Sequence, residues 1–454
     1  MKPRCWIWVV LLILLAAPAA VAQTGFILHA PLAEVPGIAV RNNLTVVRQL
    51  YPSWRNIFLV TVLDNRAPSQ VVASVKTDPG VQGGKGNIEL DGAAVLPELA
   101  SGTQLDQSTV GILDALSDRT SVSYFGSTVW AGYVNQTAAQ IIRVADAQHS
   151  YGSGSGTIAV MDTGIDPYHP VFVNSLVLGH DFTQTPDVDG PASELTDLVD
   201  QSTVAILDQS STSMVDKTIA VVNQSTVAIL DQSTVGILDT TTLPAAFGHG
   251  TMVAGAAKLV CPGCKIMPLK VFDRFASATL SNLVSAVYWA VAHGANVIQM
   301  SFSMDVSSDE LLAAIGYANS KRVICVASAG NSGLQTIVYP AGWKKASGVG
   351  STDNYDVRSV FSNYGANLVS FAAPGERVLL PYPYNNYAAA WGTSFSTPLA
   401  SGGAGLLLQI DPKINQDQVA TSLSQAQALL GQGLGAGRID LYRACQYWTL
   451  HKSK

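Results

Sequence analysis

Three short patches along the chain combine glycine with a side chain that could do chemistry. They supply a carboxylate from Asp162, an imidazole from His249 and a hydroxyl from Ser394. Glycine has no side chain, so the backbone can approach a substrate closely at these patches. A carboxylate that orients a histidine, and a histidine that removes a proton, together convert a serine hydroxyl into a nucleophile. The three patches therefore predict hydrolysis through an activated serine.

The order of the three groups along the chain discriminates among serine hydrolases. Unrelated folds thread the same groups in different orders, and Asp162, then His249, then Ser394 is the order found in subtilisin. The peptide at 392–398, Gly-Thr-Ser-Phe-Ser-Thr-Pro, matches the signature around the catalytic serine of that family, with Phe395 and Ser396 where Met and Ala are usual. Over about residues 121–445 the chain resembles the subtilisin-like serine proteases, or subtilases.

The resemblance implies a role for each residue that matches the family's motifs. Ser394 is the expected nucleophile, His249 the base and then the acid, and Asp162 the group that orients the histidine. Asn331 matches the side chain that donates a hydrogen bond to the oxyanion. In subtilisin itself, loss of that donor costs about 3 to 4 kcal/mol. The alternative for Asn331 is a glycine turn, where Asn tolerates a left-handed backbone.

The resemblance also implies a substrate pocket between two short segments. The family commonly has glycine at the position of Ser303, so a hydroxymethyl group there narrows or polarises the pocket. This substitution puts the family's broad preference for large apolar residues in doubt. The residues expected to line the pocket are Ser301, Phe302, Ser303, Ala327, Ser328, Ala329 and Gly330.

The elements that must position these groups follow from the hydrophobic pattern. From residue 157 onward, continuous apolar runs alternate with helix-like segments, which predicts a mostly parallel sheet covered on both faces. The resemblance makes this the three-layer α/β fold of subtilisin. Ligands of such sheets bind beyond the carboxyl ends of the strands, and Asp162 and Asn331 each follow a predicted strand. We expect a helix over 251–259, and we place Pro398 in the first turn of a second helix. The expected strands are 158–161, 265–271, 296–300 and 322–327.

Residues 1–22 have the three-part pattern of a secretory signal peptide. Lys2 and Arg4 precede an apolar run over 6–15, and small residues end at Ala22. We expect cleavage before Gln23 and a secreted product. An uncleaved membrane anchor is the alternative, but the apolar run is short for a span. No later run is long and apolar enough to cross a bilayer.

A propeptide and linker are expected next. Alternating apolar residues over 57–63, a helix over 69–76 and a turn at 78–80 predict a small α+β unit. This unit resembles the propeptide that subtilases use as a folding template and intramolecular inhibitor. An ordinary accessory domain is the alternative. The expected organisation is a signal peptide (1–22), a propeptide and linker (23–120), a peptidase domain (121–445) and a C-terminal tail (446–454).

Composition bounds the partners. The 454 residues are 48% hydrophobic and only 13% charged, with a formal net charge of −6, which argues against disorder and against nucleic acid as a partner.

Export leaves four cysteines. Cys261 and Cys264 have metal-site or redox spacing, but no second pair lies nearby, so an oxidised local loop is expected. Cys325 and Cys445 are then unpaired thiols.

An internal repeat with the sequence Gln-Ser-Thr-Val-(Ala/Gly)-Ile-Leu-Asp interrupts the resemblance. Three of its four copies fall in an insertion at about 190–243, which lengthens the interval between the first two patches. Each copy alternates apolar side chains between polar turns, which suits short strands in hairpins or in a small stacked array. A recent duplication that forms a surface loop is the alternative. The copies occupy 107–114, 201–208, 224–231 and 232–239.

Two other readings of the chain make different predictions. A catalytically silent binding or adhesion module would have lost catalytic residues, and none is replaced. Serine-carboxyl peptidases share the fold but have Glu in place of His249 and Asp in place of Asn331, so the residues present predict activity at neutral to alkaline pH. The expected partners are protein or peptide substrates and the chain's own propeptide. The chemistry requires no cofactor, and the resemblance allows structural calcium without identifying its ligands.

Overall fold

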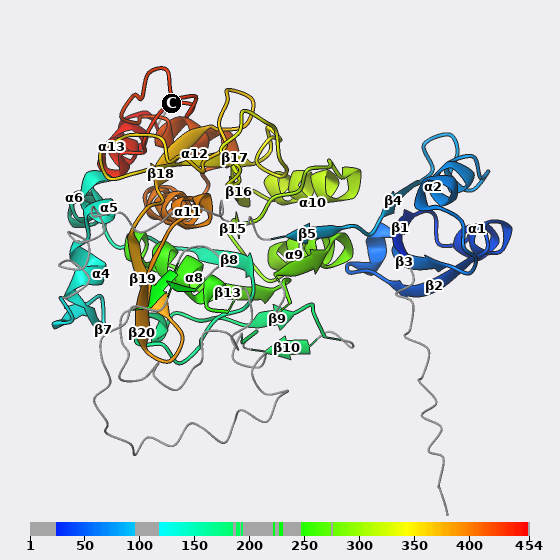
Figure 1. Cartoon of the computed structure of the whole chain (residues 1–454), viewed down its shortest axis with the longest axis horizontal. Helices are drawn as coiled ribbons and strands as arrows, with labels where there is room; N and C mark the ends of the chain where they lie inside the picture. The colour runs from blue at the N-terminus through cyan, green and yellow to red at the C-terminus, as the bar shows by residue number, and fades with distance from the viewer. Residues whose placement is uncertain are drawn as a thin grey trace, which may run out of the picture. The chain divides into compact units, whose positions relative to one another are not determined.

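The computed structural model describes most of the chain (Figure 1). The predicted signal peptide, most of the linker and most of the repeat insertion lie outside the described residues. A first unit comprises residues up to 49 and residues 56–91, and a second comprises residues 50–55 and those from 92 onward. The described residues are 24–95, 118–184, 188–190, 192–193, 221–222, 227–229, 247–273 and 276–452.

The first unit is a four-stranded antiparallel sheet with two helices. The strand order is β2-β3-β1-β4, and the core includes the buried side chains of Phe26, Val60 and Val71. The strand predicted over 57–63 and the helix predicted over 69–76 are both confirmed, as β3 and α2. The elements are β1 (Gly25–His29), α1 (Val35–Arg41), β2 (Leu44–Gln49), β3 (Ile57–Val62), α2 (Pro68–Lys76) and β4 (Asn87–Leu90).

A buried carboxylate ties the predicted turn at 78–80 to the end of α1. Asp78 accepts hydrogen bonds from the Arg41 guanidinium at 2.7 and 2.9 Å, from Asn42 Nδ2 at 2.7 Å and from the Gly80 amide at 2.8 Å. The Arg41 bond is the largest of the causes that lower the pKa of Asp78 to about 2, and the Gly80 and Asn42 bonds add to it. Because the ionised form is favoured more strongly in the folded unit than in the unfolded chain, ionisation of Asp78 stabilises this unit.

We therefore expect Asp78→Asn to destabilise the first unit by about 1 to 2 kcal/mol at pH 7, discounted because Arg41 is half exposed. The folded pKa lies below the unfolded value, so this stabilisation is full above about pH 4 and is lost as the pH falls towards 2. Hydrogen exchange of α1 and of the 78–82 turn, measured in a Ser394→Ala background that prevents self-digestion, checks both statements. If Asp78→Asn lowered the stability of the first unit by the same amount at pH 7 and at pH 2.5, both statements would be contradicted.

The second unit is built on a sheet of eight strands in the order β10-β9-β13-β8-β15-β16-β17-β18. All neighbours from β9 to β18 are parallel, and only the short edge strand β10 is antiparallel. The four predicted strands are confirmed as β8, β13, β15 and β16, which lie side by side in the sheet. The strands are β8 (Thr157–Asp162), β9 (Gly179–Asp181), β10 (Val188–Gly190), β13 (Lys265–Lys270), β15 (Val297–Met300), β16 (Ile324–Ser328), β17 (Ser347–Thr352) and β18 (Phe371–Pro374).

Helices cover both faces of this sheet, which gives the expected three layers. The helices α8 (His249–Val260) and α11 (Thr393–Ile410) pack against each other on one face, and α9 (Leu280–Ala292) and α10 (Asp309–Ser320) pair on the other (Figure 1). The helix predicted over 251–259 is therefore confirmed. No helix within the described residues is long and apolar enough to cross a membrane. The remaining helices are α4 (Ala131–Asn135), α5 (Thr137–Ile141), α6 (Val144–Tyr151), α12 (Gln416–Leu423) and α13 (Leu441–His451), with short 3₁₀ turns η1 (Ser53–Arg55) and η3 (Pro170–Phe172).

The expected boundary between the peptidase domain and a tail at 446 is wrong. Helix α13 runs through this position to His451, and Trp448 is buried in the main core together with Cys445. The boundary predicted from the sequence is too early because no motif marks this amphipathic helix. Its apolar residues become informative only when the surface that they cover is known.

The cysteines behave as predicted. Cys261 and Cys264 form a disulfide directly after α8, and both are buried. Cys325 and Cys445 are free thiols, and burial raises the pKa of each to about 12. Because the thiolate is the reactive form, these two thiols are chemically inert at neutral pH.

Small sheets decorate the second unit. A hairpin of β6 (Ser121–Tyr124) and β7 (Ser127–Trp130) precedes α4, and β14 (Ser277–Thr279) pairs with β5 (Ala93–Val95). A further sheet has the order β11-β12-β20-β19. Its strand β12 (Val227–Ile229) is the apolar centre of the third repeat copy and pairs with β20. The other strands are β11 (Val221–Val222), β19 (Val378–Tyr382) and β20 (Asn386–Ala390), and the other repeat copies lie outside the described residues.

Candidate active site

Asp162 and His249 meet at the carboxyl edge of the large sheet. Asp162 is the last residue of β8 and is fully buried, and His249 is the first residue of α8. His249 Nδ1 lies 2.7 Å from Asp162 Oδ1, which also accepts the Thr163 amide at 2.8 Å. The carboxylate therefore holds the imidazole by Nδ1 and directs Nε2 away from the sheet. Nε2 is buried and has no hydrogen-bond partner among the described residues.

Ser394 lies in the first turn of α11, which begins at Thr393. Its hydroxyl donates to the Ser301 carbonyl at 3.3 Å, and the ring of the next residue, Phe395, lies 5.4 Å from the His249 ring, centroid to centroid. The backbone amides of a first helical turn have no partner within the helix, and the helix dipole makes this end positive. The hydroxyl thus lies beside donors that favour an anion.

Pro398 does not occupy the first turn, as the sequence led us to expect. It lies inside α11, because the helix begins earlier than we placed it. A proline in this position has no N–H for the carbonyl four residues before it, which is the carbonyl of Ser394. This carbonyl accepts instead from the Ser301 hydroxyl at 2.7 Å.

Asn331 is oriented by its amide oxygen. Its Oδ1 accepts both the Thr393 amide at 2.9 Å and the Thr393 hydroxyl at 2.7 Å. With the oxygen occupied, Nδ2 is directed away from Thr393, and it is buried without a hydrogen-bond partner among the described residues. A Cβ placed on Gly392 would lie only 3.3 Å from this nitrogen, so glycine keeps the space beside the amide open.

The structure therefore brings the four predicted catalytic residues together and leaves polar atoms unsatisfied. Asp162 Oδ2, His249 Nε2 and Asn331 Nδ2 are buried and without partners in the described part of the chain. Buried polar atoms are nearly always hydrogen-bonded, so a cluster of exceptions requires an explanation. A substrate that approaches Ser394 would supply partners for the imidazole and the amide.

The expected pocket residues lie beside this cluster but differ in what they present. The side chains of Ser301 and Phe302 are directed inwards, because Ser301 bonds to the Ser394 carbonyl and the Phe302 ring packs 5.5 Å from the Phe272 ring. Only their backbone could contact a substrate. Ser303 is partly exposed. The segment Ala327, Ser328, Ala329 and Gly330 is buried at the end of β16 and leads directly into Asn331.

The sequence interpretation missed Thr163 and Thr393. Each of them forms a hydrogen bond that helps to position a proposed catalytic residue. The Thr163 hydroxyl accepts the Gly250 amide at 3.0 Å, which links the Asp162 turn to the start of α8. Thr393 holds Asn331, as described above. Both threonines stand next to a proposed catalytic residue, which was the signal available in the sequence.

Comparison with known proteins identifies the family of this chain. A model of the subtilase family matches residues 153–437. The chain belongs to the subtilase family. It is similar to thermitase of Thermoactinomyces vulgaris, with 35% identity over 212 residues that cover 44% of this chain and 75% of thermitase. It is also similar to subtilisin DY of Bacillus licheniformis, with 36% identity over 214 residues that cover 44% of this chain and 78% of the relative. Family membership makes it a hydrolase of the subtilisin type.

A solved structure supports the fold independently. Fervidolysin from Fervidobacterium pennivorans, a keratinolytic enzyme related to subtilisin, has a TM-score of 0.64 and 19% identity to this chain. The match covers 93% of this chain, which spans 61% of the fervidolysin chain. At this level of identity the likeness establishes the fold alone. It confirms the three-layer α/β architecture of a subtilase.

No site for the structural calcium that the family resemblance allows is identified among the described residues. Within the described residues, no group of three or more His, Cys, Asp or Glu side chains is arranged to hold a metal ion. Calcium can also bind carbonyl oxygens, but nothing in the structure distinguishes such a set. We assign no calcium ligands in this subtilase.

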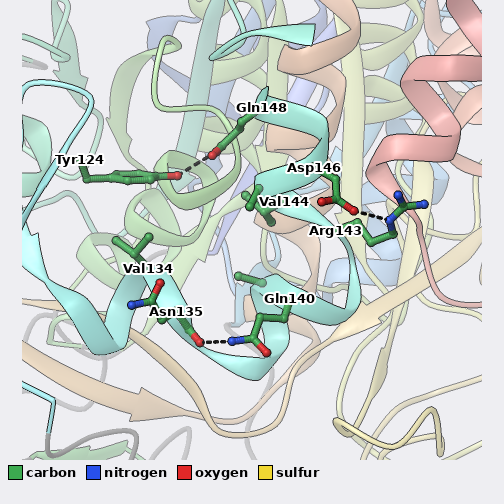
Figure 2. A pocket seen from close by; sticks show the side chains of 10 residues that line it. Tyr124, Val134, Asn135, Gln140, Arg143, Val144, Asp146 and Gln148 are labelled. Carbon is green, nitrogen blue, oxygen red and sulfur yellow. Dashed lines mark hydrogen bonds and ion pairs between the residues drawn. The ribbon is translucent and has the colours of Figure 1, made fainter. Parts of the chain in front are cut away.

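One cavity in the described residues lies away from these side chains. It has a volume of about 250 Å³ and is lined by α4, α5 and α6 together with Tyr124 (Figure 2). Its polar groups bond to one another or to the backbone: Gln148 to the Tyr124 hydroxyl, and Arg143 to Asp146. No predicted catalytic or pocket residue lines it, so it does not belong to the candidate active site.

We expect Asn331→Leu to lower kcat by about 10²- to 10³-fold with little change in KM, a size taken from the equivalent donor in subtilisin. Thr393→Val keeps Asn331 but removes one of its two fixing hydrogen bonds, so the loss there should be smaller, about three- to tenfold. Steady-state hydrolysis of a chromogenic peptide measures both variants. Equal losses in the two variants, or a loss confined to KM, would show that Nδ2 has no role in transition-state stabilisation.

Proposed function

We propose that this subtilase is a secreted serine endopeptidase that acts through an acyl-enzyme. The observation that carries the proposal is the arrangement of His249 Nε2 and Asn331 Nδ2, both buried and unpartnered, around the first turn of α11. In this proposal His249 Nε2 takes the proton of the nucleophile, and Asn331 Nδ2 donates to the oxygen on which negative charge develops. The predicted signal peptide supports export.

In the first step, Ser394 Oγ attacks the peptide carbonyl carbon while His249 Nε2 takes the hydroxyl proton. The Ser394 hydroxyl must first turn from the Ser301 carbonyl towards the imidazole, a rotation about one side-chain bond. Asp162 stabilises the imidazolium through Nδ1. The electron pair on the former carbonyl oxygen is stabilised by Asn331 Nδ2 and the Ser394 amide.

Collapse of this intermediate breaks the peptide C–N bond. His249 returns the proton to the leaving amine, and the acyl group stays on Ser394. Water then attacks the ester with His249 as the base, and a second collapse releases the acid and regenerates the hydroxyl. Every proton passes through Nε2, so the second step requires no further catalytic group.

We also propose that the N-terminal region inhibits the enzyme until it is processed. Strand β5 pairs antiparallel with β14, with Val95 opposite Ser277 and Ala93 opposite Thr279. An extended segment that adds to an exposed strand is a common mode of peptide binding, in which main-chain hydrogen bonds supply affinity. Residues 93–95 thus occupy a strand-binding edge that a peptide substrate could use.

A serine-directed phosphonate or sulfonyl fluoride should label Ser394 in protein whose N-terminal region has been removed, because His249 activates the hydroxyl. Intact-mass and peptide mass spectrometry locate the label. Ser394→Ala should abolish labelling, and the matched control Ser396→Ala should retain it, since the buried Ser396 hydroxyl has no partner among the described residues. An unlabelled but folded enzyme would favour a non-catalytic role.

Inhibition in trans tests the second proposal. A polypeptide of residues 24–95 should inhibit the processed enzyme at least tenfold more tightly than one of residues 24–91. Both contain the described part of the first unit, but only the longer one carries β5 and its hydrogen bonds to β14. Inhibition constants from progress curves measure the difference. Equal constants would exclude β5 from inhibition, and absence of inhibition by either would exclude the propeptide role.

A further inference from the structure

The proline in α11 leaves the nucleophile's own carbonyl without its helical donor. In an α-helix, each carbonyl accepts from the amide four residues later. For Ser394 that residue is Pro398, which has no N–H and whose ring crowds the carbonyl. The first turn that carries the nucleophile would therefore be weakly held by the helix alone.

The Ser301 hydroxyl takes the place of the missing amide. Ser301 Oγ lies 2.7 Å from the Ser394 carbonyl oxygen, and both residues are buried. A carbonyl can only accept, and a hydroxyl has one hydrogen, so this hydrogen belongs to the bond with Ser394. Any other hydrogen bond of Ser301 Oγ must therefore be one that it accepts.

Gln299 supplies that second bond. Its Nε2 lies 2.5 Å from Ser301 Oγ, and the residue is fully buried in β15 between apolar neighbours. A buried amide is costly unless it is hydrogen-bonded, and Gln299 Oε1 has no partner within the described residues. Gln299 thus donates from Nε2 to Ser301 while its Oε1 is left without a hydrogen bond in the described part of the chain.

We propose that Gln299 and Ser301 are positioning residues for Ser394. Gln299 occupies an acceptor site on the Ser301 oxygen, so the Ser301 hydrogen is directed to the Ser394 carbonyl. That bond replaces the donor that Pro398 removes and holds the main chain of the nucleophile, including the amide proposed for the oxyanion hole. The inference rests on the proposed role of Ser394 as nucleophile.

The relation between Ser301 and Pro398 makes the proposal testable by rescue. Ser301→Ala removes the substitute donor and should lower kcat by roughly ten- to hundredfold, with KM changed less than about threefold. Pro398→Ala restores a backbone N–H four residues after Ser394. The double variant Ser301→Ala/Pro398→Ala should therefore recover at least about tenfold in kcat over Ser301→Ala. A side chain that only filled space would show no such rescue.

Gln299→Met tests the remote member of the chain, because methionine has a similar shape but no donor. We expect kcat to fall about three- to tenfold, since the Ser301 hydroxyl is then free to turn away. Rates are normalised to the fraction of sites that the phosphonate labels, which removes misfolded protein from the comparison. If Ser301→Ala fails to fold but the double variant folds, the donor role is also supported.

Three outcomes would overturn the proposal. The double variant is no faster than Ser301→Ala, the loss falls on KM alone, or folded Gln299→Met has the parent's kcat. If both Ser301 variants fail to fold, the Gln299→Met result decides alone. Labelling of the parent enzyme is measured first: an unlabelled Ser394 means failure of the proposed function, whereas a labelled parent with unaffected variants overturns only the positioning role.

Discussion

The close packing of α8 against α11 is the constraint on which the rest of the site depends. Both helices begin at the same edge of the sheet, and their first turns carry His249 and Ser394. The helices can approach closely because Gly402 has no side chain. A Cβ at this position would lie 2.6 Å from Val260 Cβ and 2.9 Å from the Ala257 carbonyl oxygen. A side chain at this position would therefore force the two helices apart where they meet.

Around this pair, hydrogen bonds occupy one end of His249 and one end of Asn331, two of the proposed catalytic side chains, and leave the other end without a partner in the described part of the chain. Asp162 takes the Nδ1 side of the histidine, and Thr393 takes the oxygen of Asn331. Both side chains are fixed by hydrogen bonds at the end that does not face a substrate. They therefore need little reorientation when charge develops on the substrate. The Ser301 bond to the Ser394 carbonyl extends the same arrangement to the main chain of the nucleophile.

Sequence reasoning succeeded where a local pattern is sufficient and failed where a residue acts through a distant partner. The strands β8, β13, β15 and β16 were predicted from continuous apolar runs, and the disulfide from a two-residue spacing. Pro398 was misplaced because the helix start is not visible in its own neighbourhood, and the bond from Ser301 to the Ser394 carbonyl was missed for the same reason. The end of the domain was placed too early for the same reason, since Trp448 is recognisable as core only against the helices it packs on.

The sequence by itself determined the chemistry proposed for this subtilase: the types of the proposed catalytic groups, their order and the parallel sheet whose strand ends carry two of them. Those properties depend on residue identity and local periodicity, which can be seen along one chain. Only the tertiary structure decided which atoms of each group are occupied and which stay free, and that Gln299 bonds to Ser301 beneath the nucleophile. Hydrogen-bond saturation depends on distance and direction between segments far apart in the chain, and no pattern in the sequence encodes these directly.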